Sequence, residues 1–248
     1  MVENKLKLND DKSEFILISS PNNKKKFNSM HMSITIGDDV LLAANNVRNL
    51  GVVMDSVLNM EAHITSVCRS CYFHLRNIGA IRKYLDVDTA AQVIHSFVTS
   101  RLDYCNALLY GLPEKLNDRL QKVQNTAVRI ITLCNSQDHI TPHLKTLHWL
   151  PVRLRIKFKL LLITYKIMND LAPSYLCDLL IPREIPRELR SSDMDILVVP
   201  RSRTVSYGDR TFAVAAPQLW NELTLDIKRA PSLTAFKRSL KTHLFDAF

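Results

Sequence analysis

Apolar residues recur at every third or fourth position through most of the chain after about residue 57. This spacing places them on one face of an α-helix, and it constrains the fold more than any other feature of the sequence. The clearest apolar stripes are Ile64, Val67, Cys68, Cys71, Leu75 and Ile78; Leu116, Leu120, Val123, Ala127, Ile130, Ile131 and Cys134; and Leu233, Phe236, Leu240 and Leu244. The pattern predicts three amphipathic helices.

Two further helices are predicted from local signals. Asp86 or Asp88 can cap a helix that begins just after them. Its apolar face is expected to consist of Ala90, Val93, Ile94 and Phe97, in a pattern that extends to Leu109. Residues 151–170 start with apolar and basic residues in alternation, which is a strand pattern. Pro151 at a helix-start position and the long apolar sequel favour a helix there instead.

The first 56 residues have a different pattern, with short apolar or alternating runs separated by turn residues. Segments 14–19, 32–37 and 47–55 are predicted strands. The expected fold class is therefore α+β, mainly α, with a small N-terminal antiparallel β region followed by a helical bundle. The expected divisions are 1–56, 57–180, an irregular linker over 181–210 that is rich in proline, and a helical segment over 211–248.

Composition excludes several classes of protein. The 248 residues include only five glycines and contain neither GxGxxG nor GxxxxGK[ST], so nucleotide binding through a glycine-rich loop is not expected. The N-terminus has no apolar core of a signal peptide, and the odd count of five cysteines favours reduced thiols. No apolar run is long enough to span a membrane. We expect an intracellular protein, cytoplasmic or nuclear, with no membrane partner.

No catalytic or metal site can be predicted from the residue pattern. Gly37-Asp38-Asp39 resembles a polymerase catalytic hairpin, but these are favoured turn residues and a hairpin turn is the better interpretation. Cys68 and Cys71 form a CxxC inside a helical stripe, which favours buried thiols over zinc ligands. His139, His143 and His148 lie close in sequence without a matching carboxylate or cysteine pattern. We therefore assign no metal ligands.

Basic residues are concentrated in one part of the chain. The formal net charge is +9, and residues 115–166 contain ten Lys and Arg against two acidic residues, a net charge of +8. Such an excess favours a polyanionic partner, most often nucleic acid, although a solvated face beside an acidic domain is the alternative. The candidate phosphate-binding residues are Arg119, Lys122, Arg129, Arg153, Arg155, Lys157 and Lys159.

Several sequence blocks occur in an order that resembles one family. They are LKLNDDKSEFILI (6–18), VRNLGVVMD (47–55), FVTSRLDYCNALLYGLP (97–113), LQKVQNTAVRIIT (120–132), HITPHLKTLHWLPVRLRIKFKLLLITYKIMN (139–169), APSYLCDLL (172–180), RTFAVAAPQLWNELT (210–224) and SLTAFKRSLKTHLF (232–245). Together they resemble the C-terminal part of the reverse transcriptase, an RNA-directed DNA polymerase, of non-LTR (LINE-type) retrotransposons of the jockey/CR1/L2 kind.

The resemblance implies roles for particular residues. Residues 1–56 would be the last strands of the polymerase palm, and the helices from about 57 would form a thumb that holds the RNA and DNA of the template–primer duplex. The family motifs are matched by Asn9, Lys12, Glu14, Leu50, Gly51 and Val52. Lys12 would lie near the phosphates of the incoming nucleotide, as a contact to the leaving group.

The chain departs from the family at the catalytic centre, because the [FY]-x-D-D strand and the earlier metal-binding aspartate are absent from the sequence. We expect a truncated, catalytically inactive fragment that binds nucleic acid and has no cofactor of its own, with Mg²⁺ required only by a full-length enzyme. The alternatives are a helical protein-interaction scaffold without a nucleic-acid role, and an active reverse transcriptase of which this sequence is an incomplete version. The pattern does not indicate an oligomeric state.

Overall fold

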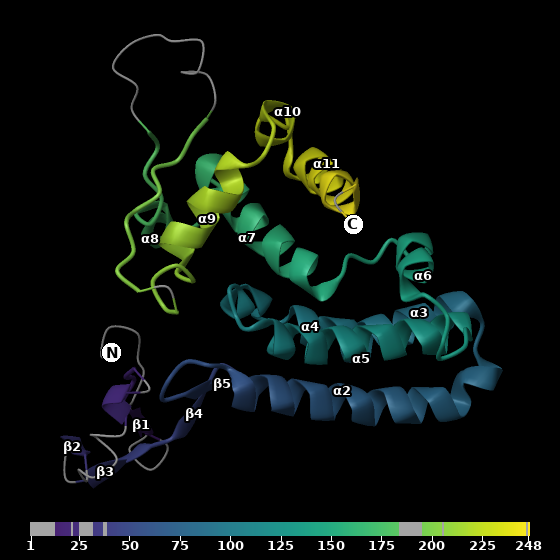
Figure 1. Ribbon diagram of the computed structural model, residues 1–248, viewed down its shortest axis with the longest axis horizontal. Helices are drawn as coiled ribbons and strands as arrows, with labels where there is room; N and C mark the ends of the chain where they lie inside the picture. The colour runs from purple at the N-terminus through teal and green to yellow at the C-terminus, as the bar shows by residue number, and fades with distance from the viewer. Residues whose placement is uncertain are drawn as a thin grey trace, which may run out of the picture. The chain divides into compact units, whose positions relative to one another are not determined.

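The computed structural model describes residues 13–20, 22–24, 32–36, 39–183, 195–204, 206–246 and 248. They divide between two compact units, Met1–Arg69 and Ser70–Phe248, which Figure 1 shows as a ribbon coloured along the chain. Within the described residues, all named strands belong to the first unit, and helices make up the second. This confirms the predicted α+β, mainly α class.

Three strands of the first unit form one small sheet in the order β1-β3-β2. Strand β2 (Ser33–Ile36) pairs antiparallel with β3 (Asp39–Ala44), while β1 (Phe15–Ile16) pairs parallel with β3. The strand predicted over 14–19 is therefore formed over two residues only. The turn predicted at Gly37-Asp38-Asp39 falls between β2 and β3, although residues 37 and 38 lie outside the described part of the chain.

The single strand predicted over 47–55 is wrong, because this segment is a β-hairpin. Strand β4 (Asn46–Asn49) pairs antiparallel with β5 (Val52–Asp55). The two connecting residues, Leu50 and Gly51, have φ values of 45° and 85°. Positive φ at both central positions is the geometry of a type I′ turn, which suits the twist of a hairpin. Asparagine, aspartate or glycine usually occupies the first position of such a turn. The leucine found there therefore gives no turn signal in the sequence.

Asp55 connects this hairpin to the first long helix. Its buried carboxylate accepts hydrogen bonds from the backbone N–H groups of Val57 (3.1 Å), Asn59 (3.0 Å) and Met60 (2.7 Å). These groups lie directly before α2 (Glu61–Ile81), where backbone donors lack helical partners. Asp55, the last residue of the VRNLGVVMD block, thus holds the backbone that leads into the N-terminus of α2.

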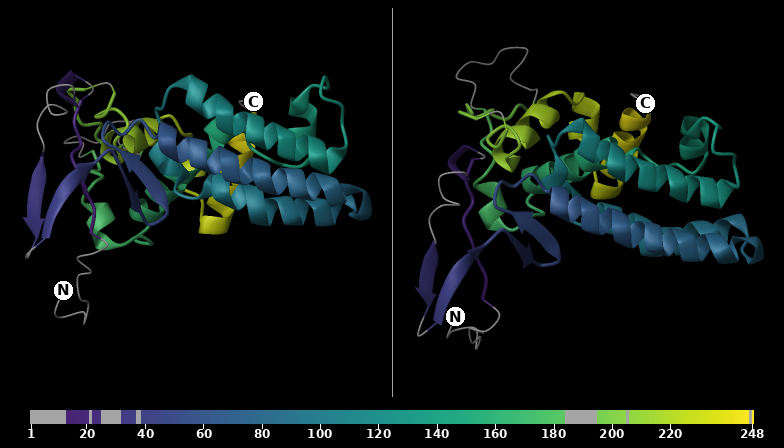
Figure 2. Two further views of the ribbon diagram at one scale, coloured as in Figure 1. Left: turned by 90° about the horizontal axis from the view of Figure 1, so that it is seen from below. Right: turned by 60° about the horizontal axis from the view of Figure 1, so that its bottom comes forward.

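The first half of the second unit consists of the end of α2 and the helices that follow it. After the 3₁₀ turn Arg82–Tyr84 come α3 (Val87–Ile94), the π-helical turn His95–Thr99, α4 (Ser100–Asp103), the 3₁₀ turn Asn106–Leu109 and α5 (Glu114–Thr132). Helix α5 packs against α3, and the ribbon views show the two side by side (Figures 1 and 2). The predicted cap is confirmed at Asp86, whose carboxylate accepts a hydrogen bond from Thr89 N–H at 2.7 Å.

The predicted apolar stripes are largely confirmed in these helices. The side chains of Ile64, Cys68, Cys71, Leu75 and Ile78 on α2, and Leu116, Leu120, Val123, Ala127 and Ile131 on α5, are buried. Both CxxC cysteines are buried thiols, as predicted. Helix α5 ends at Thr132, so Cys134 lies beyond it and does not extend the stripe.

Phe97 was predicted to face the core, but its side chain is 48% exposed and Val98 is buried instead. The cause is the π-helical turn, which adds one residue to a turn and rotates the following side chains relative to an α-helix. The helix does not continue to Leu109 either. It ends after Asp103, and Cys105 adopts a left-handed conformation with φ 51°.

Arg82 joins the end of α2 to the end of α5. The residue is 7% exposed, and its guanidinium donates to the carbonyl oxygens of Ile130 (2.8 Å), Ile131 (2.7 Å) and Leu85 (2.5 Å). Ile130 and Ile131 belong to the last turn of α5, where carbonyls lack helical partners and the helix dipole favours a cation. The arginine therefore caps α5 from another helix.

The second half of this unit is built around α7 (Val152–Met168), which confirms the helix predicted over 151–170. The other helices are α6 (Ile140–Thr146), α8 (Ser174–Cys177), α9 (Phe212–Asn221), α10 (Leu225–Lys228) and α11 (Leu233–Asp246). In α11 the predicted core residues Phe236, Leu240 and Leu244 are buried. Within the described part of 181–210, the only pairing outside named elements is a bridge between Pro182 and Leu197.

Aromatic side chains form the centre of this second core. The rings of Tyr165 and Phe236 stack with centroids 4.1 Å apart, and Trp220 lies 6.2 Å from Phe236. The Tyr165 hydroxyl donates to the carbonyl of Ala230 at 2.7 Å, so the polar group of a buried residue is satisfied. These contacts hold α7, α9 and α11 together and fix which residues of α7 and α11 remain at the surface.

Candidate nucleic-acid interface

Helix α7 carries four of the predicted phosphate-binding residues, and it directs them to two opposite flanks. Arg153 and Lys157 are one turn apart on one side, and Arg155 and Lys159 are one turn apart on the other. Successive residues of an α-helix turn by about 100°, so Arg153 and Arg155 point about 200° apart. The alternation that resembled a strand in the sequence thus becomes two basic rows on a helix.

The first flank borders a hollow of about 250 Å³, in which basic groups from three segments meet. Its lining comprises Asp103, Asn106, His148, Leu150, Arg155, Phe158, Lys159, Leu162 and Lys241. Lys241 comes from α11, and His148 from the loop between α6 and α7. Burial lowers the pKa of Lys241, and the positive charge of Arg155 lowers it further. Lys241 and Arg155 line the same hollow, so their positive charges repel each other.

Asp103 is the one acidic residue in this lining, and Arg155 binds it. Arg155 Nε donates to Asp103 Oδ1 at 2.8 Å, and Nη2 donates to Oδ2. The Asn106 amide also donates to Asp103 Oδ1, at 3.3 Å, whereas the buried Asn106 Oδ1 accepts no hydrogen bond from any described residue. The hollow therefore presents mainly cationic nitrogens, with the single carboxylate of Asp103 bound to Arg155.

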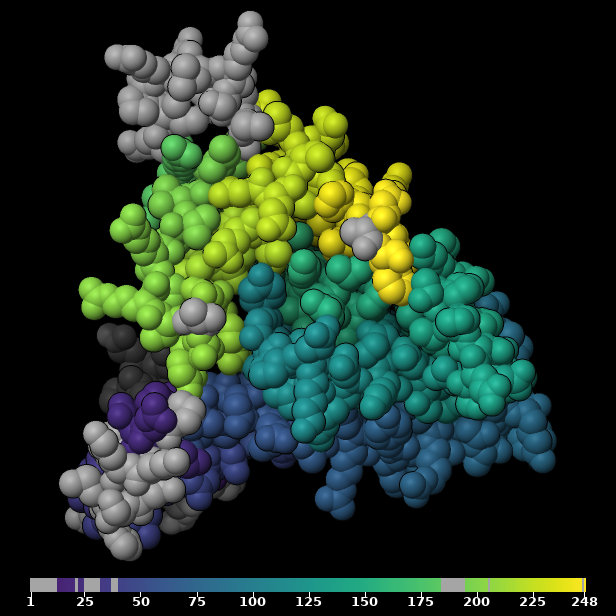
Figure 3. Space-filling view, in the orientation of Figure 1, coloured from purple at the N-terminus to yellow at the C-terminus, as the bar shows by residue number. Residues whose placement is uncertain are grey.

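The second flank borders a hollow of about 460 Å³ that contains Arg153, Lys157 and Arg210. Arg153 pairs with Glu114 at 2.8 Å, but both side chains are well exposed, so this ion pair contributes little to stability. Arg210 Nε donates to the carbonyl of Tyr110 at 3.1 Å, which fixes the arginine at the rim. The space-filling view of Figure 3 shows the helices of this unit from one side.

The three candidates on α5 lie apart from these flanks. Arg119 and Arg129 are partly exposed and Lys122 is exposed, all beside the buried stripe of the helix. Arg129 donates to the carbonyls of Asn135 (3.4 Å) and Asp138 (3.5 Å), and it thus supports the loop after α5. The seven predicted residues consequently form three groups and not a single continuous face.

The motif-matching residues of the N-terminal region belong to the first unit. Glu14 is exposed, and its Oε2 accepts a hydrogen bond from Arg48 N–H at 3.4 Å. Leu50 and Gly51 form the hairpin turn, and Val52 is buried after it. Asn9 and Lys12 lie outside the described residues, so the phosphate contact expected of Lys12 stays a prediction.

Sequence analysis missed three basic residues of the two hollows, namely His148, Lys241 and Arg210. Their elements are separated from α7 by loops or by other helices, and no local spacing signals that they meet there. It also missed a group after α5, Cys134, Asp138 and His143, because the spacing of the histidines alone matches no metal motif. The order C-x₃-D-x₄-H directly after a helix end was the available signal.

Comparisons with known proteins gave no match among family models, curated proteins or solved structures. Among the described helices, none combines the length and the apolar character that crossing a bilayer requires.

Proposed function

We propose that this chain binds nucleic acid through backbone phosphates, as the C-terminal part of a non-LTR retrotransposon reverse transcriptase. The observation that carries the proposal is the meeting of Arg155, Lys159, Lys241 and His148 around one hollow. These residues come from segments far apart in the sequence. A row of charges on one helix is ordinarily just a solvated face, whereas here cations from separate segments meet, and Asp103, which pairs with Arg155, leaves Lys159 and Lys241 uncompensated within the lining of the hollow.

A phosphate suits the chemistry of this hollow. Lysine ammonium groups bind phosphate as point charges, so Lys159 and Lys241 are the direct contacts, while Arg155, whose Nε and Nη2 are bound by Asp103, adds positive charge beside them. The apolar rim of Leu150, Phe158 and Leu162 excludes water on one side and so strengthens these contacts.

The proposed role is to hold a substrate and not to react with it. The sequence contains no [FY]-x-D-D segment and therefore lacks the carboxylate pair with which the family holds Mg²⁺. We expect no DNA synthesis by this chain alone. The proposal concerns binding to RNA and to RNA–DNA duplex, and the resemblance in sequence supports that choice of partner.

The test is fluorescence anisotropy with a labelled RNA–DNA duplex, a single-stranded RNA and a duplex DNA over a range of salt concentrations. Affinity should fall linearly on a double-logarithmic plot, with a slope of about −0.9 per neutralised phosphate for duplex DNA. The double variant K159Q/K241Q should bind more weakly and reduce the slope by about 1 to 2.

The matched control is R76Q/K83Q, which removes the same charge from exposed positions at the end of α2 and the turn after it. It should change affinity less than the first pair does. An equal loss of affinity in both double variants would show that binding depends only on net charge. It would contradict the assignment of this hollow as the phosphate-binding site. Absence of binding even at low salt would refute the proposed function.

A protein-interaction scaffold is the second candidate function, and exposed aromatic residues favour it. Phe73 is 61% exposed and Phe97 is 48% exposed. His74 lies between them, with ring centroids 5.4 Å from Phe73 and 5.2 Å from Phe97. Exposed aromatic side chains are enriched at binding surfaces. Loss of a captured protein partner in F73S/F97S, together with no nucleic-acid binding at low salt, would favour this function over the first.

A further inference from the structure

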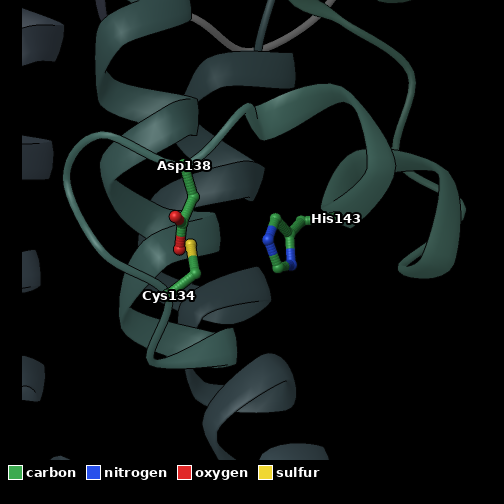
Figure 4. Close-up of side chains that lie close together, drawn as sticks. All are labelled: Cys134, Asp138 and His143. Atoms are coloured by element: carbon green, nitrogen blue, oxygen red, sulfur yellow. The ribbon is translucent and has the colours of Figure 1, made fainter.

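Three side chains with metal-binding atoms lie together just after the end of α5. The Cys134 sulfur, a carboxylate oxygen of Asp138 and an imidazole nitrogen of His143 are all within 4.8 Å of one another. Figure 4 shows Cys134 and Asp138 side by side on the loop, with the ring of His143 facing them from α6. Cys134 and His143 are partly buried, and Asp138 is exposed.

Backbone contacts bring these residues together without help from a ligand. Leu133, with φ 55°, turns the chain sharply at the end of α5 and aims Cys134 back along the helix end. Asn135 N–H donates to Asp138 Oδ2 at 2.8 Å, which orients the carboxylate and leaves Oδ1 available. The hydrogen bonds that Arg129 makes here go to backbone carbonyls, so they fix the loop and not the carboxylate.

The combination of donor atoms selects a class of metal. Thiolate, imidazole and carboxylate are all ligands of Zn²⁺, and three protein ligands with a solvent molecule in the fourth position make a common tetrahedral zinc site. A soft thiolate disfavours Mg²⁺ and Ca²⁺, which prefer oxygen ligands. Metal–ligand distances of about 2.0–2.3 Å place tetrahedral donors roughly 3.3–3.8 Å apart, so the side chains need to close by about 1 Å.

We propose that Cys134, Asp138 and His143 bind one divalent cation of the zinc class, with water as the fourth ligand. Binding releases the thiol proton of Cys134 to solvent, so thiolate and carboxylate together balance the charge of the ion. The bound metal connects the end of α5 to α6 and stabilises the loop between them. This site is independent of the proposed nucleic-acid binding, and no residue is shared with the basic hollow.

The experiment uses the full chain, stripped of metal with a chelator and then titrated with Co²⁺. One equivalent should produce absorption from charge transfer between sulfur and cobalt, and Zn²⁺ should displace it. The variants C134S and H143A should each weaken metal binding by more than about tenfold. Replacing a residue that only hydrogen-bonds to a metal ligand already lowers metal affinity by about tenfold or more. D138N should weaken it as well, and Zn²⁺ should raise the Tm of the wild-type chain but not that of C134S.

The matched controls are C177S and H139A, which remove another partly buried cysteine and a neighbouring exposed histidine. Both should retain the cobalt spectrum and the affinity of the wild-type chain. The proposal is overturned if the spectrum survives in C134S and H143A, if it depends on Cys177 or His139 instead, or if the wild-type chain binds neither Co²⁺ nor Zn²⁺. Circular dichroism confirms that each variant is folded, as expected for substitutions at a partly exposed loop.

Discussion

Replacing Arg82 with methionine should destabilise the helical unit by about 3 kcal/mol. Methionine keeps most of the apolar stem but removes the donors that pair with the carbonyls of Ile130, Ile131 and Leu85. A buried acceptor left without a partner costs about 1–3 kcal/mol, and this applies in full to the carbonyl of Ile131, while the half-buried carbonyls of Ile130 and Leu85 add smaller losses. The loss of a cation at the end of the α5 dipole acts in the same direction.

The assay is urea unfolding followed by far-UV circular dichroism and by tryptophan fluorescence, to which Trp149 and Trp220 both contribute; Trp220 is 1% exposed. Coincident transitions from the two probes, with an unchanged m-value, allow the free energies of unfolding to be compared. Arg82→Lys should fall between Arg82→Met and wild type, because an ammonium keeps the charge but lacks the planar fork.

The control is Arg76→Met, an exposed position one and a half turns earlier on α2. We expect it to change the free energy of unfolding by less than about 0.5 kcal/mol. If Arg82→Met were as mild as this control, the three hydrogen bonds would have no net stabilising effect, and our account of how α5 ends would be refuted.

Three further predictions concern other parts of the chain. Leu50→Asn should stabilise the β4–β5 hairpin by about 1 kcal/mol, because asparagine tolerates the positive φ that strains leucine, and slower amide exchange in the hairpin would show it. Burial, and secondarily the charge of Arg48, lower the pKa of His63 below 6.5. The unfolded state therefore binds more protons as the pH falls, and the first unit should lose stability below about pH 6.5, a dependence that His63→Gln should flatten in thermal melts. Tyr165→Phe should cost about 1–2 kcal/mol in urea unfolding by leaving the carbonyl of Ala230 unpaired, and an unchanged midpoint would contradict this.

The helices of this protein follow from its sequence because their apolar residues repeat with the helical period. The buried faces of α2, α5 and α11 and the cap at Asp86 depend on residues within a few turns of one another, and these were predicted. The hairpin at Leu50 was not, because its turn uses a residue that ordinarily avoids positive φ. The π-helical turn before α4 was missed for a related reason, since periodicity alone does not reveal one extra residue in a turn.

The basic residues of the candidate site on α7 were predictable, whereas Lys241, His148 and Arg210 and the arrangement of the site were not. A high density of lysine and arginine identified α7 correctly as the basic helix. The sequence could not show that Arg155 and Lys159 meet Lys241, since that contact depends on how α11 packs against α7. Nor could it show that Cys134 and His143 face each other, because this depends on the turn at Leu133 and on the position of α6.

The two basic flanks of α7 restrict the shape of any polyanion that uses both. A stiff double helix lying along Arg155 and Lys159 is a nearly straight rod, and it cannot bend around an α-helix to reach Arg153 and Lys157 on the far side. A single strand is flexible enough to pass from one flank to the other, and two separate strands can each follow one. For a polyanion that uses both rows, helix α7 thus separates two paths by the width of one helix.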